Sequence, residues 1–179
     1  LILDEVALAA GKDYFRLGAI AVSNDGRLIA YAVDDNGSER FTVQIKDLQT
    51  GELLSDVIED TNTDLVWAAG DTMLVYGRAN ENWRVDSIRV HRIGSDAASD
   101  TEIFHEDVPG FTADIGMSAN REWLILSASD NETSEIRLLP ASDPLAAQQL
   151  VRARQKGVEY SVDLHGEQLF VWTNDEHIN

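Results

Sequence analysis

Turn signals recur along this chain at a nearly constant spacing, and this repeat constrains the fold more than any other feature. Four segments rich in Gly, Asn, Asp and Ala occur at residues 23–26, 68–71, 118–121 and 164–167, with centres near positions 25, 70, 120 and 165. The centres are 45, 50 and 45 residues apart. Gly, Asn and Asp tolerate the positive φ angles that tight hairpins need. A period of roughly 40–50 residues built from short strands is typical of β-propellers.

Each turn separates two short apolar runs. The runs before the turns are 19–22, 65–67, 115–117 and 160–162, and those after them are 28–33, 73–76, 123–126 and 169–172. They are aliphatic, β-branched or aromatic and too short for helices, so they indicate strands. We expect these two strands to be the innermost and most buried of each unit.

A third and a fourth run complete each unit. The third run alternates apolar and polar residues at 41–46, 88–93 (with one slip) and 136–138, which predicts a strand with one wet face. The fourth runs, 53–58, 101–105 and 149–153, are shorter and more polar, as suits an outer edge. The Ala-rich stretch 144–149 is expected to form at most one helical turn.

The sequence therefore predicts an all-β fold: a partial β-propeller of about three and a half four-stranded antiparallel blades. We expect a single domain over residues 1–179, with blades at approximately 17–60, 61–108 and 109–155 and a half blade at 156–179. The chain starts at Leu1, and residues 1–10 lack the features of a signal peptide, so we expect an internal piece of a longer protein.

An open partial ring should leave an apolar blade face at each end. We expect those faces at residues 28–33 on one side and 169–172 on the other. Because such faces are costly to expose, they favour self-association into a homodimer, by ring completion or by edge pairing.

The charge balance narrows the range of partners. With 32 acidic and 14 basic residues the formal charge is −18, which argues against nucleic acid and anionic membrane surfaces and favours basic ligands. An acidic, merely solvating surface is the simpler alternative. The chain contains no cysteine, which excludes disulfides and thiolate chemistry and suits a reducing, cytoplasmic compartment.

Motifs for catalysis are missing from the sequence. There is no G-x-S-x-G nucleophile elbow and no H-E-x-x-H zinc motif, and His91, His105, His165 and His177 follow no ligand spacing. Residues 34–39 faintly resemble a calcium loop, but a polar hairpin loop is the better interpretation. We expect no catalytic residue, no metal site and no cofactor.

Acidic residues on or beside the innermost runs are the candidate site. They are Asp64, Asp114 and Glu159, with Asp163 nearby. Innermost strands line the central channel of a propeller, so these acids would form a negatively charged funnel for basic peptides. The alternative is that they are turn residues at strand ends that face solvent.

Several segments carry a family resemblance. They are Ile2–Asp4, Gly18–Gly26, Lys46–Gly51, Val66–Ala68, Val90–Gly94, Thr133–Leu139 and Lys156–Asp163, and the last two are the most specific. In this order the chain resembles the propeller domain of the prolyl oligopeptidase family of serine peptidases, in its trypsin-like oligopeptidase B branch.

The resemblance implies a seven-bladed propeller that caps a catalytic α/β-hydrolase domain. In that family the Ser-Asp-His triad and the acids that recognise Arg or Lys belong to the hydrolase domain, so none is carried over to this chain. It implies a parent endopeptidase that cleaves short peptides after Arg or Lys, with an inactive propeller that gates access and forms part of the cavity. The expected partners are the hydrolase domain and short basic peptides.

Two alternatives stay open. The first is a stand-alone protein-interaction propeller, which the lack of a recurring Gly-His…Trp-Asp signature disfavours. The second is a propeller enzyme with metal ligands in its own channel, for which the scattered acids and histidines give little support.

Overall fold

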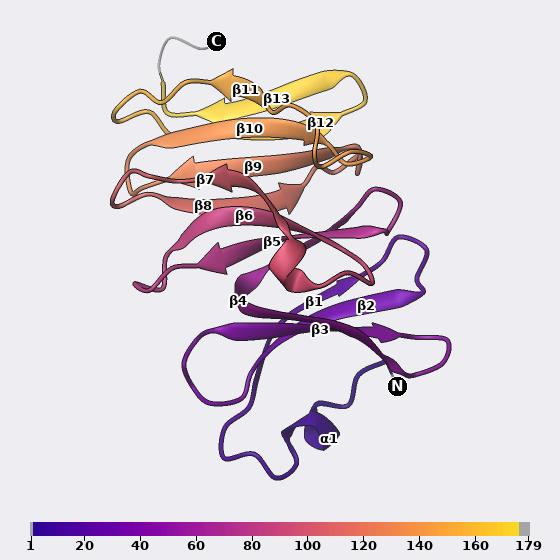
Figure 1. The fold of residues 1–179 in the computed structure, drawn as a ribbon. Coiled ribbons are helices and arrows are strands. Elements are labelled where there is room, and N and C mark those ends of the chain that lie inside the picture. Colours follow the sequence, from indigo (N-terminus) through magenta and orange to yellow (C-terminus); the bar gives the residue numbers. More distant parts are fainter. Residues whose placement is uncertain (1, 176–179) are drawn as a thin grey trace.

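The computed structural model describes residues 2–175 as thirteen strands with two short helices (Figure 1). The strands of the N-terminal half are β1 (Arg16–Val22), β2 (Leu28–Asp34), β3 (Phe41–Asp47), β4 (Leu53–Ala68), β5 (Met73–Ala79), β6 (Val85–Arg92) and β7 (Thr101–His105). The remaining strands are β8 (Thr112–Met117), β9 (Trp123–Ser129), β10 (Ser134–Pro140), β11 (Gln149–Arg152), β12 (Tyr160–His165) and β13 (Gln168–Thr173). The predicted all-β propeller fold is confirmed.

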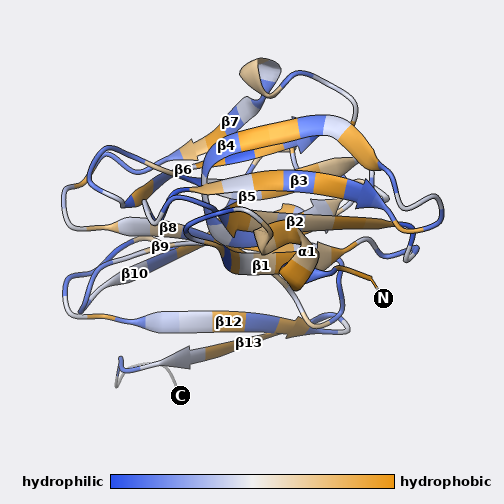
Figure 2. Ribbon diagram, turned by 90° about the horizontal axis from the view of Figure 1, so that it is seen from below, coloured by the Kyte–Doolittle hydropathy of each residue, from blue (hydrophilic) through white to orange (hydrophobic). Residues whose placement is uncertain are grey.

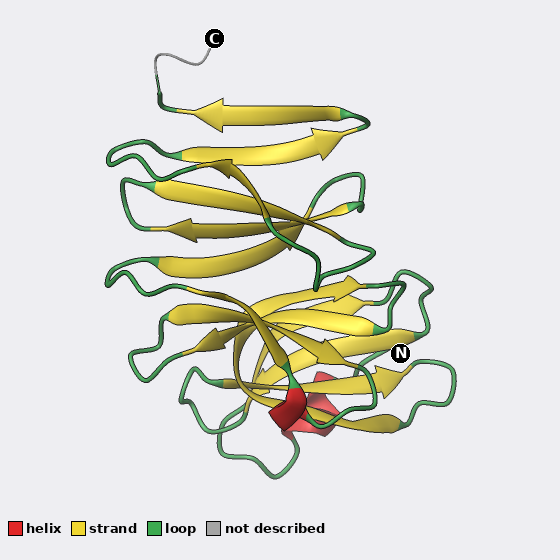
Figure 3. Cartoon of the chain, turned by 45° about the horizontal axis from the view of Figure 1, so that its top comes forward, coloured by secondary structure: helices red, strands yellow, loops and turns green. Residues whose placement is uncertain are grey.

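The helices are minor elements. Helix α1 (Glu5–Ala9) precedes β1 and is capped by the Asp4 side chain, and η1 (Ala97–Ser99) is a single 3₁₀ turn before β7 (Figure 3). Residues 144–149 form a turn and the start of β11 rather than a helix. Within residues 2–175, no helix has the length and apolar character needed to cross a bilayer.

Strand β4 joins two four-stranded units into one seven-stranded sheet, in the order β1-β2-β3-β4-β5-β6-β7. Residues up to Thr61 pair with β3, and residues from Thr61 to Ala68 pair with β5. The change of partner coincides with a positive φ of 58° at Asp60 and an irregular register. We call β1–β3 with residues 53–60 the first blade, and residues 61–68 with β5–β7 the second blade.

The third blade is a separate sheet in the order β11-β10-β9-β8, and β12 and β13 form a terminal hairpin. Neighbouring strands are antiparallel throughout. The blades stack face to face in chain order (Figure 1). Strand β4 crosses the expected blade boundary at residue 60 without a break. The boundary is marked instead by the change of hydrogen-bonding partner from β3 to β5.

Each apolar core lies between two consecutive blades. One cluster joins Trp67 and Leu74 of the second blade to Val43 and Ile45 of the first. Two further clusters occupy the next interfaces, one between the second and third blades and one between the third blade and the terminal hairpin. Burial of apolar area between sheets, at about 25 cal/mol per Å², therefore holds successive blades together.

Two of the four repeat turns share one pattern of side-chain hydrogen bonds. The Ser23 hydroxyl donates to Asp25 and accepts from the backbone N–H of Leu28, and the Ser118 hydroxyl makes the same two bonds with Asn120 and Trp123. Gly26 has a φ of 72° in the first turn. The similar signals at residues 23–26 and 118–121 thus reflect similar hydrogen bonding.

Two expectations about burial are wrong. The sequence predicts one wet face for β6 and β10, but both are buried almost throughout. Of the three third strands only β3 keeps an alternating burial pattern, and Figure 2 shows the alternating hydropathy along it. The reason is that β6 and β10 lie between two neighbouring blades. Conversely, β1 and β13 were expected to be deeply buried, yet β1 is half-buried and β13 is mostly exposed.

The expected open face at residues 28–33 is also wrong, because β2 is buried. On that side the exposed apolar residues are Ile20 and Val22 of β1. On the other side the expectation holds: Leu169, Phe170, Val171 and Trp172 of β13 are all exposed, with Trp172 83% exposed.

Candidate acidic site on the innermost strands

The innermost strands are identified by their mutual contacts: β1 touches β4, and β4 touches β8. Asp64 lies in the second half of β4, Asp114 lies in β8, and Glu159 immediately precedes β12. Each acid therefore stands near the start of the first strand of its blade. These starts follow the connections that bring the chain in from the outer strand of the preceding blade.

Asp64 and Asp114 form a pair of neighbouring carboxyls from adjacent blades. Burial raises the pKa of Asp64, the charge of Asp114 raises it further, and a hydrogen bond from the Asn62 amide opposes both effects. Burial likewise raises the pKa of Asp114. Neither carboxyl has a salt bridge among the described residues. Because no cation offsets the burial of these two carboxyls, the pKa of each is expected to be raised.

Glu159 lies in a different setting. It is exposed and lines a groove between the third blade and the terminal hairpin, together with Tyr160, Ser161 and Trp172. Its backbone N–H donates to Asn174 at 2.9 Å. No contact in the described part of the chain joins Glu159 to the Asp64–Asp114 pair, so the structure brings together two of the three acids.

Asp163 has a structural role. Its carboxylate accepts the backbone N–H groups of Ala119 (2.9 Å) and Leu164 (2.7 Å), and these bonds lower its pKa. Asp71 of the second blade does the same for the first blade, accepting from Asn24 and from the N–H of Asp25. In both places an acid of one blade holds the hairpin turn of the blade before it.

The loop at residues 34–39 is closed by its own first acid. Asp34 accepts the backbone N–H groups of Asn36, Gly37, Ser38 and Glu39. Although burial opposes ionisation, these four donors outweigh it and lower the pKa of Asp34. The polar hairpin loop is the correct interpretation, because the carboxylate that a calcium loop would offer is used by the backbone.

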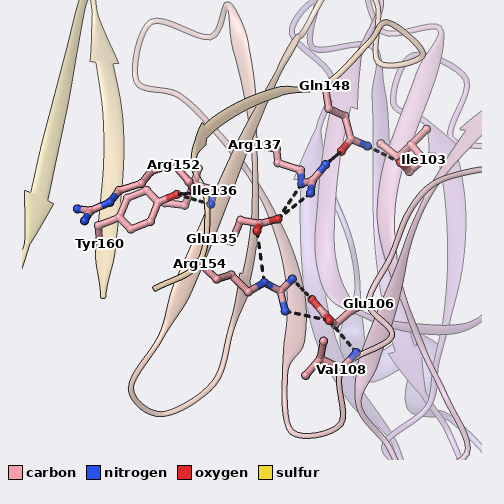
Figure 4. Close-up of polar contacts among 10 residues, drawn as sticks. All are labelled: Ile103, Glu106, Val108, Glu135, Ile136, Arg137, Gln148, Arg152, Arg154 and Tyr160. Atoms are coloured by element: carbon pink, nitrogen blue, oxygen red, sulfur yellow. Dashed lines mark hydrogen bonds and ion pairs between the residues drawn. The ribbon is translucent and has the colours of Figure 1, made fainter. Parts of the chain in front are cut away.

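A partly buried ion network joins the second and third blades (Figure 4). Arg154 makes two hydrogen bonds to Glu106, one of them at 2.5 Å, and lies 3.4 Å from Glu135. Glu135 also pairs with Arg137, and the Arg154 guanidinium lies 4.3 Å from the Phe111 ring centroid. The hydrogen bond with Glu106, with the charges of both glutamates, raises the pKa of Arg154.

His91 is the functional group that the sequence patterns did not single out. It is fully buried in β6 between two aspartates, whereas His105 and His165 are exposed and His177 lies outside the described residues. The slip in alternation at residues 88–93 is its one sequence signal. Its two partners, Asp56 and Asp100, are 35 and 9 residues away in the chain, so a local pattern does not reveal them. Among residues 2–175, no group of three or more acidic or histidine side chains could hold a metal ion.

The stacked four-stranded units and their innermost acids define a β-propeller domain. The family described as prolyl oligopeptidase, N-terminal beta-propeller domain, matches residues 1–179, and the chain belongs to this family. Since the propeller match spans the whole chain, these residues are not those of the family's catalytic domain. The family resemblance predicted from the sequence is confirmed.

Individual relatives agree with this assignment. The chain is 34% identical over 175 residues to dipeptidyl aminopeptidase BI of Pseudoxanthomonas mexicana, covering 97% of this chain and 24% of that protein. It is 33% identical over 181 residues to protease 2 of Moraxella lacunata, covering 100% of this chain and 26% of that protein.

Solved structures show the same relationship. Oligopeptidase B from Leishmania major superposes with a TM-score of 0.93 at 28% identity, over 98% of this chain and 25% of that one. Oligopeptidase B from Trypanosoma brucei, with covalently bound antipain in a closed form, superposes with a TM-score of 0.90 at 30% identity, over 98% of this chain and 25% of that one. The chain thus spans about a quarter of the length of its relatives.

Proposed function

We propose that this chain is the non-catalytic propeller part of a serine endopeptidase of the oligopeptidase B type, which cleaves short peptides after Arg or Lys. The observation that carries the proposal is the pair Asp64 and Asp114, two carboxyls on adjacent innermost strands without a cationic partner among the described residues. The similarity to two oligopeptidase B structures supports the same substrate class.

The proposed mechanism of the propeller is selection before catalysis. Carboxylates on a concave, partly buried surface attract cations over a longer range than the same groups in open solvent. An Arg or Lys side chain beside Asp64 and Asp114 would favour their charged forms and so offset the cost of their burial. The narrow interior of the ring would exclude large substrates. Its partner in this role is a catalytic α/β-hydrolase domain, and its setting is the cytoplasm.

A second candidate comes from the relative named dipeptidyl aminopeptidase BI. An enzyme of that kind would need a free peptide N-terminus, whose ammonium group the same acids would attract. A stand-alone interaction propeller is the third candidate, and it would have no peptidase activity.

The test uses the full-length protein that carries this chain. Peptide reporters blocked at the N-terminus, with Arg or Lys before the scissile bond, are compared with the same peptides carrying Gln there and with unblocked dipeptide reporters. Cleavage of the blocked basic reporters alone supports the proposal. Cleavage of only the unblocked dipeptides would support the aminopeptidase, and no cleavage would support the interaction propeller. Residues 1–179 alone should cleave none of them.

A further inference from the structure

A histidine between two carboxylates lies at the junction of the first two blades. His91 of β6 is fully buried, and its Nδ1 lies 2.7 Å from Asp100 Oδ1 while its Nε2 lies 2.9 Å from Asp56 Oδ1. The side chains of Asp56 and Asp100 are 1% and 0% exposed. Asp56 belongs to the first blade, whereas His91 and Asp100 belong to the second.

Each carboxyl group also contacts a hydrogen-bond donor outside the imidazole ring. Asp100 Oδ2 accepts the hydroxyl of Tyr76 at 2.9 Å, and Asp100 Oδ1 faces Nδ1 of His91. Asp56 Oδ1 accepts the backbone N–H of Gly94 at 2.5 Å in addition to facing His91. Among residues 2–175, Asp56 Oδ2 is buried without a hydrogen-bond partner, so His91 is the group placed to compensate a charge on Asp56.

Two ionised carboxylates, one at each ring nitrogen, require a hydrogen on both nitrogens, since a neutral imidazole donates from only one. Arg89 approaches the cluster but donates to the backbone oxygen of Asp100 and not to its carboxylate. Without a charged imidazole, two buried negative charges would therefore be left without a compensating cation, an arrangement that proteins avoid.

We propose that His91 is held as a doubly protonated imidazolium, and that this buried cation locks the first blade to the second by bridging Asp56 and Asp100. The lock acts on β4, the strand that the two blades share. Asp56 lies four residues before the turn at Asp60 and Asp64 lies four residues after it. Fixing Asp56 therefore also restrains the course of the strand that carries Asp64.

Nitrogen-15 NMR of histidine-labelled full-length protein tests the protonation state directly. At pH 7 both ring nitrogens of His91, assigned with the His91→Gln variant or through the response to Asp100→Asn, should have the shifts of protonated nitrogens. A His91 with one unprotonated nitrogen would overturn the proposal. The shifts are read from the unaltered chain, and the variants serve only to assign them.

A double-mutant cycle tests the lock between blades. His91→Gln leaves two uncompensated carboxylates, so His91→Gln combined with Asp56→Asn should lose less stability than the two single changes added together. We expect the coupling to change the unfolding equilibrium constant by about ten-fold. His105→Gln, at an exposed histidine, is the control and should change it little. Strictly additive losses from His91 and Asp56 would show that the two groups are not coupled and would contradict the lock.

Discussion

At the scale of single residues, the many carboxylates of this chain have distinct roles. Asp34 and Asp163 accept backbone N–H groups, which lowers the pKa of each. Backbone N–H groups do not contribute to the pKa shifts of Asp64 and Asp114, and burial raises the pKa of each. The sequence could mark all of them as acids near strand ends, but not which has which role, because the deciding partners of Asp64 and Asp163 lie about 45–50 residues away.

The first prediction concerns Asp64→Asn. The pKa of Asp64 is raised in the folded protein, so the folded state disfavours its charged form and stability falls as pH rises past the unfolded value of about 3.9. Replacing Asp64 by Asn should therefore raise the urea midpoint at pH 7. The advantage should shrink as pH falls toward 4.

The matched control is Asp163→Asn, which should change the stability at pH 7 in the opposite direction. The pKa of Asp163 is lowered, so its charge contributes stability above the unfolded pKa and the variant should be less stable at pH 7. An Asp64→Asn protein that is less stable than the unaltered protein at pH 7 would count against a desolvated carboxyl at this position.

At the scale of elements, the repeat predicted the strands well and their burial poorly. Period and alternation are local properties, and they placed all thirteen strands in or near their observed ranges. Burial depends on what packs against each face, and that is a property of neighbouring blades. Strands β6 and β10 are therefore more buried than their alternation indicates, and β13 less.

Two glycines on innermost strands give the second prediction. Gly18 lies at the register shift of β1, and a Cβ added there would collide with the Phe41 ring, so Gly18→Ala should cost about 1–3 kcal/mol of stability. Gly116 of β8 has open space around the same position, and Gly116→Ala should be neutral or stabilising by about 0.5 kcal/mol. Urea unfolding of the two variants would reveal the contrast, and equal effects would mean that Gly18 is not confined.

At the scale of the whole molecule, two strands at opposite ends of the stack carry exposed apolar residues. One carries Ile20 and Val22, and the other carries Leu169 to Trp172. Apolar patches of this kind usually mark contact surfaces. The sequence predicted open sides from the incomplete repeat but placed one of them on β2, which is buried in the structure.

The third prediction is that residues 1–179 produced alone self-associate. Covering β13 removes apolar area from water, at about 25 cal/mol per Å², against the cost of association. Trp172→Glu should weaken the assembly, while Trp83→Glu, also an exposed tryptophan, serves as the matched control. Sedimentation at micromolar concentration decides the matter: a single species near the 19.8 kDa monomer mass at all concentrations would contradict the prediction.

The function proposed for this chain is that acids on its innermost strands draw basic peptides toward a catalytic domain. It is tested most directly by kcat/KM of the full-length protein for a blocked Arg reporter, before and after the combined change Asp64→Asn, Asp114→Asn and Glu159→Gln. At low ionic strength the variant should lose kcat/KM on the order of ten-fold, and the loss should shrink as salt screens the charges. A kcat/KM that is unchanged at low ionic strength would contradict the account.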